Sequence, residues 1–329
     1  MYKRLALFII ILIVMTACQA NNEDDTKTEN DTTNEHEEVA DLPQTNLQIS
    51  DEGEDVSTLQ HYLQEIGYDI DETGTFNNET LSVLTDIQRQ NEELNVTGLY
   101  DEKTAQFIDD ILNEKETIEN DEWSSQTNHD TYADEDDVLT NPYNVLALVN
   151  KQYALPGDYE PEDLVVPDVA FPFTEDLPKK QLRRVAAEAL EELFAATEAE
   201  GLELFAQSGY RSYDRQVEIF DANVAEHGEE RANQFSARPG QSEHQTGLTM
   251  DVTSREVDFL LEEEFGETAE GKWLEENAHE FGFIIRYPKG KEDITKYDYE
   301  PWHLRYVGEQ AAREIAQDEL TLEQYLTID

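Results

Sequence analysis

The fold of the larger part of this 329-residue chain depends on the stretch Ser242-Glu243-His244-Gln245-Thr246-Gly247-Leu248-Thr249-Met250-Asp251. Gly247 lies between His244 and Asp251 and indicates a turn there rather than a continuous helix. Residues 249–253 then have the composition of a short strand. A loop that leads into a strand brings the His244 imidazole and the Asp251 carboxylate to one point. Both are therefore candidate metal ligands.

A second candidate stretch follows in Tyr299-Glu300-Pro301-Trp302-His303-Leu304-Arg305-Tyr306. His303 supplies a second imidazole, and two histidines with one carboxylate are a common set for a catalytic zinc ion. Nitrogen ligands disfavour Ca²⁺ and Mg²⁺, which prefer oxygen. Glu300 lies where a carboxylate can take a proton from water during peptide hydrolysis; the alternative is a surface acid. The other histidines are expected not to bind metal: His36, His61, His129, His227 and His279.

A third stretch, Ser208-Gly209-Tyr210-Arg211-Ser212, comes at the end of a predicted strand and is followed by Gln216. A guanidinium binds a carboxylate through two parallel hydrogen bonds. Arg211 would therefore suit an enzyme that recognises the free C-terminus of a peptide. The alternative is an arginine paired with one of the many nearby acids.

Hydrophobic spacing around these stretches predicts mixed secondary structure for residues 139–329. Helices are expected at 182–193, 213–225, 273–279 and 309–316, and strands at 202–207, 249–253, 281–287 and 302–307. This order favours an α+β domain, with helices packed on a small, mainly antiparallel sheet.

Residues 47–113 form a separate unit with helical periodicity. The apolar residues at helical spacing fall into three groups: Val56, Leu59, Leu63 and Ile66; Leu81, Leu84 and Ile87; Phe107, Ile108 and Ile111. They predict a small three-helix domain. Residues 19–46 and 114–138 are acidic and poor in apolar side chains, so we expect a disordered tether and a linker.

Residues 1–18 have the layout of a secretory signal. Lys3 and Arg4 precede the apolar run Leu5 to Met15, which is too short to span a bilayer. The segment ends in Met15-Thr16-Ala17-Cys18, and Cys18 is the only cysteine. It resembles the bacterial lipoprotein signal, which implies a lipid on Cys18 and a location at the cell membrane facing the wall. The alternative is an ordinary signal peptide.

The charge of the chain excludes one class of partner. Its 76 acidic and 23 basic residues give a formal net charge of −53. Backbone binding to nucleic acid needs many lysines and arginines, so we expect no nucleic-acid partner. The acidity itself indicates a solvated surface suited to high salt.

The blocks SGYRS, SEHQTGLxxD and EPWHxRYVG, in that order, resemble the VanY-type D-alanyl-D-alanine carboxypeptidases, a family of zinc peptidases. The resemblance implies one Zn²⁺ held by His244, Asp251 and His303, with Glu300 as catalytic base. It also implies that the substrate's terminal residue contacts Arg211, Gln216 and Ser242, and that Tyr210 and Trp302 shape the pocket. The implied activity is removal of the C-terminal D-alanine from peptidoglycan stem peptides. The choice between a D,D and an L,D bond stays open.

The N-terminal unit, with Val56-x-x-Leu59-Gln60, Gly74-x-Phe76 and Val96-Thr97-Gly98, resembles a peptidoglycan-binding domain. The resemblance implies wall binding; the alternative is a spacer. For the whole chain we expect a monomer that acts on stem peptides and glycan strands. Three alternatives remain: a cross-bridge endopeptidase, which would not need Arg211; a zinc-binding wall protein without turnover; and a purely adhesive lipoprotein.

Overall fold

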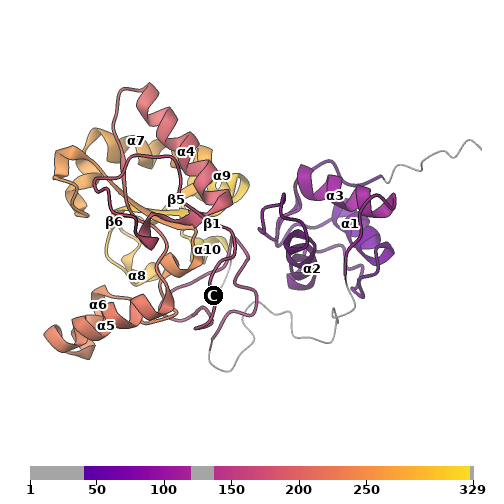
Figure 1. Ribbon diagram of the computed structural model, residues 1–329, viewed down its shortest axis with the longest axis horizontal. Coiled ribbons are helices and arrows are strands. Elements are labelled where there is room, and N and C mark those ends of the chain that lie inside the picture. Colours follow the sequence, from indigo (N-terminus) through magenta and orange to yellow (C-terminus); the bar gives the residue numbers. More distant parts are fainter. Residues whose placement is uncertain (1–40, 120–136, 327–329) are drawn as a thin grey trace, which may run out of the picture. The chain divides into compact units, whose positions relative to one another are not determined.

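The computed structural model describes residues 41–119 and 137–326, which form an N-terminal helical domain and a larger α+β domain (Figure 1). The predicted signal segment with Cys18, most of the predicted tether and most of the predicted linker lie outside the described residues. His36 and His129 do so as well. Among the described helices, none combines the length and the apolar character needed to cross a bilayer.

The N-terminal domain contains the three predicted helices, α1 (Glu54–Glu65), α2 (Asn78–Arg89) and α3 (Glu102–Leu112). Side chains cap two of them: Asn77 accepts from the Thr80 backbone N–H, and Asp101 accepts from that of Thr104. The folded unit begins earlier than the predicted boundary at residue 47. Leu42 is buried in its core, and the Tyr100 hydroxyl donates to the Pro43 carbonyl. The predicted tether therefore ends before Leu42.

The larger domain is built on an antiparallel sheet of four strands, in the order β3 (Phe205–Ser208), β4 (Thr249–Thr253), β6 (Glu300–Tyr306), β5 (Phe283–Tyr287). The predicted antiparallel sheet is thus confirmed. A second sheet contains only β1 (Leu164–Val165) and β2 (Leu182–Arg183).

Seven α-helices belong to this domain: α4 (Arg184–Ala199), α5 (Tyr213–His227), α6 (Glu229–Phe235), α7 (Ala269–Asn277), α8 (Glu292–Thr295), α9 (Glu309–Gln317) and α10 (Leu322–Tyr325). Five 3₁₀ helices connect them: η1 (Pro178–Lys180), η2 (Glu243–Thr246), η3 (Arg255–Val257), η4 (Glu263–Glu267) and η5 (Ala278–Phe281). The helix predicted from residue 182 begins at Arg184 instead. Leu182 and Arg183 pair with β1 and form a strand. The position of Leu182 also fits the apolar spacing of the following helix, and for this reason the sequence predicts a helix from residue 182.

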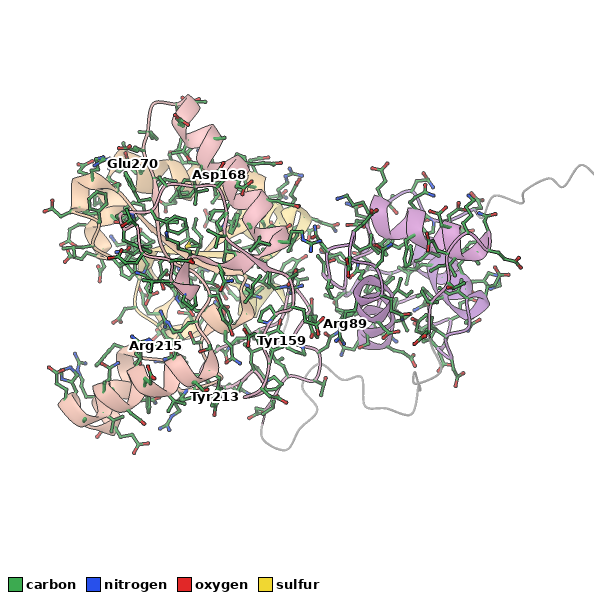
Figure 2. The ribbon with its side chains drawn as sticks, in the orientation of Figure 1. Arg89, Tyr159, Asp168, Tyr213, Arg215 and Glu270 are labelled. Carbon is green, nitrogen blue, oxygen red and sulfur yellow. The ribbon has the colours of Figure 1, made fainter. Side chains whose placement is uncertain are left out.

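Side chains alternate along the strands, so one face of the sheet packs into the core and the other carries the polar residues of the candidate site. Met250, Val252 and Leu304 join α4 and α9 side chains in one buried cluster, where each large aliphatic side chain contributes roughly 1.5–3 kcal/mol. Their neighbours Asp251 and His303 point to the opposite face, because successive strand residues alternate sides. Helices α5 and α6 lie apart from α4, α7 and α9 (Figure 1). The Ser212 hydroxyl caps α5 by accepting from the Arg215 N–H, and Arg215 is exposed (Figure 2).

Candidate metal centre

The three predicted metal ligands meet in the structure. Strands β4 and β6 pair with Asp251 directly opposite His303. Gly247 adopts a left-handed conformation with φ 68°, which ends η2 and turns the chain into β4, so that His244 faces the same point. One nitrogen or oxygen atom from each of His244, Asp251 and His303 lies within 4.8 Å of the others, and all three residues are buried.

Hydrogen bonds orient both imidazoles. The Nδ1 atom of His244 donates to the Gly209 carbonyl at 2.8 Å, which leaves Nε2 to face Asp251 Oδ2 at 3.4 Å. His303 is turned the other way: its Nε2 faces Glu243 Oε2 at 3.4 Å, and its Nδ1 lies 3.3 Å from Asp251 Oδ1. A ligand histidine held through its second nitrogen is the usual arrangement in metal sites.

Glycine is required at position 209 by a close approach of two backbones. A Cβ atom there would lie 2.5 Å from the Gln181 carbonyl oxygen and 2.8 Å from the Met250 side chain. Residue 209 also supplies the carbonyl that orients His244. A larger residue would therefore displace this carbonyl.

The ligand set fits zinc. Asp251 Oδ1 is buried, and it accepts no hydrogen bond from the residues that the structure describes, as expected of an oxygen reserved for a cation. Burial, together with the charge of Arg211, lowers the pKa of His244 to about 3, so its imidazole is neutral near pH 7. Burial opposes ionisation of Asp251, yet the neighbouring His244 and His303 hold its pKa below the ordinary value. Burial opposes protonation of His303, yet the three carboxylates around it (Asp251, Glu243 and Glu300) raise its pKa and so stabilise positive charge at this point. Two imidazoles with one carboxylate suit Zn²⁺ with an open position.

Glu300 lies at the rim of the metal centre, at the first position of β6. Its Oε2 atom is 3.4 Å from His303 Nδ1, and a quarter of its side chain is exposed. Among the ligands and their neighbours it is the carboxylate with access to solvent, as a proton carrier requires. The geometry is consistent with the predicted role as base.

A cavity of about 240 Å³ opens over these residues. It is bounded by the metal ligands, by Glu300 and by side chains from the α5–α6 region. The predicted contacts that line it are Arg211, Gln216, Ser242 and Trp302. The structure differs at Tyr210, which is buried but does not line the cavity.

Arg211 is held in position without a carboxylate. Its Nη1 donates to Gln216 Oε1 at 3.0 Å, and Gln216 in turn donates to the Ala237 carbonyl at 2.7 Å. Its backbone N–H donates to the His244 carbonyl. Among the described residues, no acid forms an ion pair with Arg211, although acids outnumber bases threefold in the chain. A positioned cation of this kind indicates an anionic ligand.

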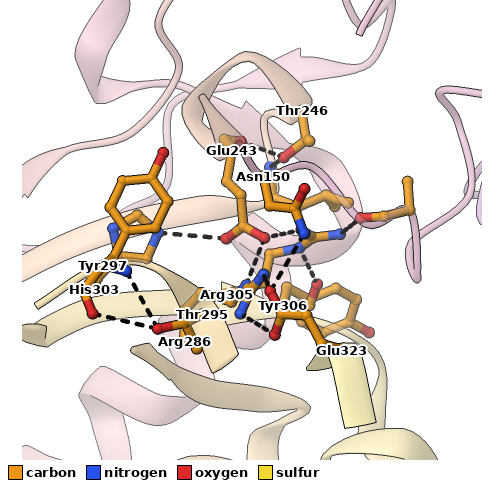
Figure 3. Close-up of polar contacts among 12 residues, drawn as sticks. Asn150, Glu243, Thr246, Arg286, Thr295, Tyr297, His303, Arg305, Tyr306 and Glu323 are labelled. Atoms are coloured by element: carbon orange, nitrogen blue, oxygen red, sulfur yellow. Dashed lines mark hydrogen bonds and ion pairs between the residues drawn. The ribbon is translucent and has the colours of Figure 1, made fainter. Parts of the chain in front are cut away.

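Several residues at the centre were not predicted. Glu243 is fully buried and contacts His303, and Arg286 and Arg305 contact Glu243 (Figure 3). Tyr287 packs against the His303 ring at 4.8 Å between centroids. A glutamate or arginine in an acidic chain is expected at the surface, so no local pattern distinguishes these charges.

The remaining histidines in the described parts of the chain lie away from the metal-binding group. The side chains of His61 and His227 are 56% and 41% exposed and lie near helix surface acids. His279 lies beside Glu280. None of the three joins the metal-binding group.

Comparison with known proteins supports these assignments. A family model described as "VanY: D-alanyl-D-alanine carboxypeptidase" matches residues 179–309, and one described as "Putative peptidoglycan binding domain" matches residues 52–108. The "Putative carboxypeptidase YodJ" of Bacillus subtilis is 52% identical over 243 residues, which cover 73% of this chain and 87% of that protein.

Two further relatives cover the larger domain. The bifunctional D-Ala-D-Ala dipeptidase and D-Ala-D-Ala carboxypeptidase VanXYC of Enterococcus gallinarum is 37% identical over 186 residues, 55% of this chain and 93% of that protein. The solved structure of the LdcB LD-carboxypeptidase is 60% identical, with a TM-score of 0.57, and the match covers 58% of this chain and 89% of that one. With these relatives and this metal centre, the chain belongs to the VanY family of D-alanyl-D-alanine carboxypeptidases and is a zinc carboxypeptidase of peptidoglycan.

Proposed function

We propose that this enzyme removes the C-terminal D-alanine of stem tetrapeptides, and therefore acts mainly as an L,D-carboxypeptidase. The observation that carries the carboxypeptidase assignment is Arg211, a cation in the cavity that holds the candidate metal ligands and Glu300; no carboxylate in the described part of the chain forms an ion pair with it. The preference for the L,D bond is supported by 60% identity to the LdcB LD-carboxypeptidase, against 37% to the D-Ala-D-Ala enzyme of Enterococcus gallinarum.

In the proposed mechanism, substrate binding, carbonyl polarisation and proton transfer are carried out by different groups. The terminal carboxylate of the peptide accepts hydrogen bonds from Arg211, which fixes the scissile bond beside the metal centre. Zinc, when bound by His244, Asp251 and His303, supplies the positive charge that polarises the scissile carbonyl and favours ionisation of the attacking water. Glu300 takes the proton of that water and returns it to the amine nitrogen of the departing D-alanine.

Cleavage of an internal cross-bridge is the second candidate. An endopeptidase would bind chain on both sides of the scissile bond and would have no terminal carboxylate for Arg211. The small cavity, about 240 Å³, favours a single small leaving residue. The D,D bond of a pentapeptide remains the closest competitor, because its leaving group is also D-alanine.

The experiment is incubation of the mature chain with purified tetrapeptide, pentapeptide and cross-linked dimer, each with and without a zinc chelator, followed by mass spectrometry. We expect loss of one D-alanine, faster from the tetrapeptide, and abolition by the chelator. Faster loss from the pentapeptide would overturn the L,D preference alone. Cleavage of the dimer without loss of terminal D-alanine would overturn the carboxypeptidase assignment.

The cellular position is a further part of the proposal. The residues Met15-Thr16-Ala17 before Cys18, which resemble a lipoprotein signal, support a lipid anchor. The match of residues 52–108 to a peptidoglycan-binding domain supports attachment to the wall. The lipid would hold at the membrane a protein whose net charge of −53 is repelled by anionic surfaces. A Cys18→Ser variant should leave the membrane fraction; if it fractionates with membranes like the natural chain, the anchor assignment is wrong.

A further inference from the structure

Behind the zinc site, four charged side chains form a buried group that the peptidase chemistry does not explain. The side chains of Glu243, Arg286 and Arg305 are fully buried, and that of Glu323 is 11% exposed. They come from η2, β5, β6 and α10. Figure 3 shows them joined by dashed contacts that end on the ring of His303.

The contacts form one continuous series. Glu323 accepts two hydrogen bonds from Arg286, Nη1 to Oε2 at 2.9 Å and Nη2 to Oε1 at 2.7 Å. Arg286 Nε donates to Glu243 Oε1 at 2.8 Å. The second oxygen of Glu243, Oε2, faces His303 Nε2 at 3.4 Å. Glu323 is thus linked to a zinc ligand through two intermediate side chains.

The two arginines are fixed in different ways. Arg305 donates through Nη1 to Glu243 at 2.7 Å and through Nη2 to the Val145 and Ala147 carbonyls at 2.8 Å. It therefore keeps backbone partners whatever happens to the acids. The hydrogen bonds of Arg286 in the described residues go only to Glu243 and Glu323. Glu323 binds both Nη atoms of Arg286, which leaves Nε to face Glu243, and the guanidinium packs over the Tyr287 ring.

The group is electrically balanced, with two carboxylates and two guanidinium groups. Burial opposes ionisation of Glu243, but Arg286 and Arg305 hold its pKa well below the ordinary value. For Glu323, burial is likewise outweighed, and Arg286 keeps its pKa below the ordinary value. Loss of one carboxylate would leave an uncompensated positive charge in the interior. That charge would lie two contacts from a ligand of a divalent cation.

We infer that Glu323 is a positioning residue of the zinc centre, which acts through Arg286 and Glu243 to hold His303 with Nδ1 toward the metal. Glu323 lies outside the stretch 179–309 that the carboxypeptidase family model matches. Because Glu323 lies on α10 and binds Arg286, this helix supports the metal centre. Thr321 and Gln324 fix this helix by a reciprocal capping box. The inference concerns zinc binding and does not depend on which peptide bond is cleaved.

Without the Glu323 charge, the two Nη atoms of Arg286 lose their carboxylate partner, and one of them can turn toward Glu243. If two nitrogens of Arg286 bound Glu243, Oε2 of Glu243 would move away from His303. The His303 ring would then lose the contact that holds its Nδ1 toward the metal. Both effects, the ring release and the extra positive charge, weaken zinc binding.

The test is the zinc dissociation constant of the full mature chain, measured by competition with a chelator at fixed pH. Glu323→Gln removes the charge and keeps the shape, and Glu319→Gln, at an exposed site before the same helix, is the matched control. We expect Glu323→Gln to weaken zinc binding about 10–100-fold, the usual effect of losing a ligand's supporting contact. We expect Glu319→Gln to match the natural chain.

A double variant separates charge from shape. Glu323→Gln with Arg286→Met removes the uncompensated cation, and it should bind zinc more tightly than Glu323→Gln alone. Circular dichroism of the zinc-free proteins reports folding. If Glu323→Gln does not fold, the pair Glu323→Asp and Glu319→Asp decides, since only the former should weaken zinc binding. Equal zinc affinity within about twofold for the position-323 and position-319 variants would overturn the inference.

Discussion

Substitution of Arg211 tests the central step of the proposed function, recognition of a free carboxylate. The guanidinium carries five N–H groups. Within residues 41–119 and 137–326, two side-chain contacts engage them, with Gln216 Oε1 at 3.0 Å and a long one with Ser208 Oγ at 3.5 Å. The remaining N–H groups are available to the peptide terminus. Arg211→Gln removes the charge and this fork, whereas Arg211→Lys keeps the charge alone.

The magnitude follows from the hydrogen bonds that are lost. A hydrogen bond to a charged group contributes about 1.5–3 kcal/mol, so loss of two would cost roughly 3–6 kcal/mol. At 1.4 kcal/mol per factor of ten, kcat/KM for the free peptide should fall about 10²–10⁴-fold in Arg211→Gln. Arg211→Lys should lie between this variant and the natural enzyme.

The assay compares each enzyme on a stem peptide and on the same peptide with an amidated C-terminus. The natural enzyme should prefer the free acid by a factor similar to the loss in Arg211→Gln, and that variant should treat both substrates alike. Arg215→Gln, on the exposed side of α5, is the matched control and should retain the preference. If the natural enzyme cleaved acid and amide at equal rates, Arg211 would not read the terminus and the reasoning would fail.

Three further predictions follow from the same geometry. Glu300→Gln should lower kcat about 10²–10⁴-fold while zinc stoichiometry by metal analysis stays at one; near-natural turnover would remove Glu300 from the mechanism. Gly209→Ala places a Cβ 2.5 Å from a carbonyl oxygen, so urea unfolding should show a loss of about 1–3 kcal/mol with weaker zinc binding, and unchanged stability would refute the close contact. The pKa values of Glu243 and Glu323 are depressed in the folded state, so their contribution to stability is present above the ordinary carboxyl pKa of about 4.3 and is lost as pH falls below it. Urea unfolding of the zinc-free chain at pH 7, 5 and 3.5 should show this loss, with a smaller pH dependence in Glu323→Gln; equal dependence would contradict it.

The sequence predicted those parts of the site that depend on local patterns. Strand β4 has the bounds expected from its composition, Thr249–Thr253, and α5 begins at the expected Tyr213. Two of the candidate zinc ligands, His244 and Asp251, could be predicted because they share one turn-and-strand unit. His303 could be predicted because two histidines with one carboxylate are a common ligand set for catalytic zinc.

The supporting charges could not be predicted in the same way. Glu243 contacts Arg286 and Arg305 across 43 and 62 positions of sequence, and no short-range spacing indicates such a pairing. An acid in a chain with 76 acids gives no compositional signal. Leu182 shows the opposite difficulty, since its spacing fits the following helix although its backbone pairs with β1.

Arg286 and Arg305 are buried and paired with acids, so the charge behind the metal centre is balanced while the surface of the protein is strongly acidic. Two of the 23 basic side chains are enclosed in a neutral set behind the zinc centre, so the solvent-facing surface is even poorer in cations than the composition states. Mobile counterions will gather around that surface, and the range of its repulsion shrinks from about 10 Å at 0.1 M salt to about 3 Å at 1 M. Ionic strength should therefore govern how the enzyme approaches an anionic wall. The metal centre, backed by internally compensated charge, is insulated from the same changes.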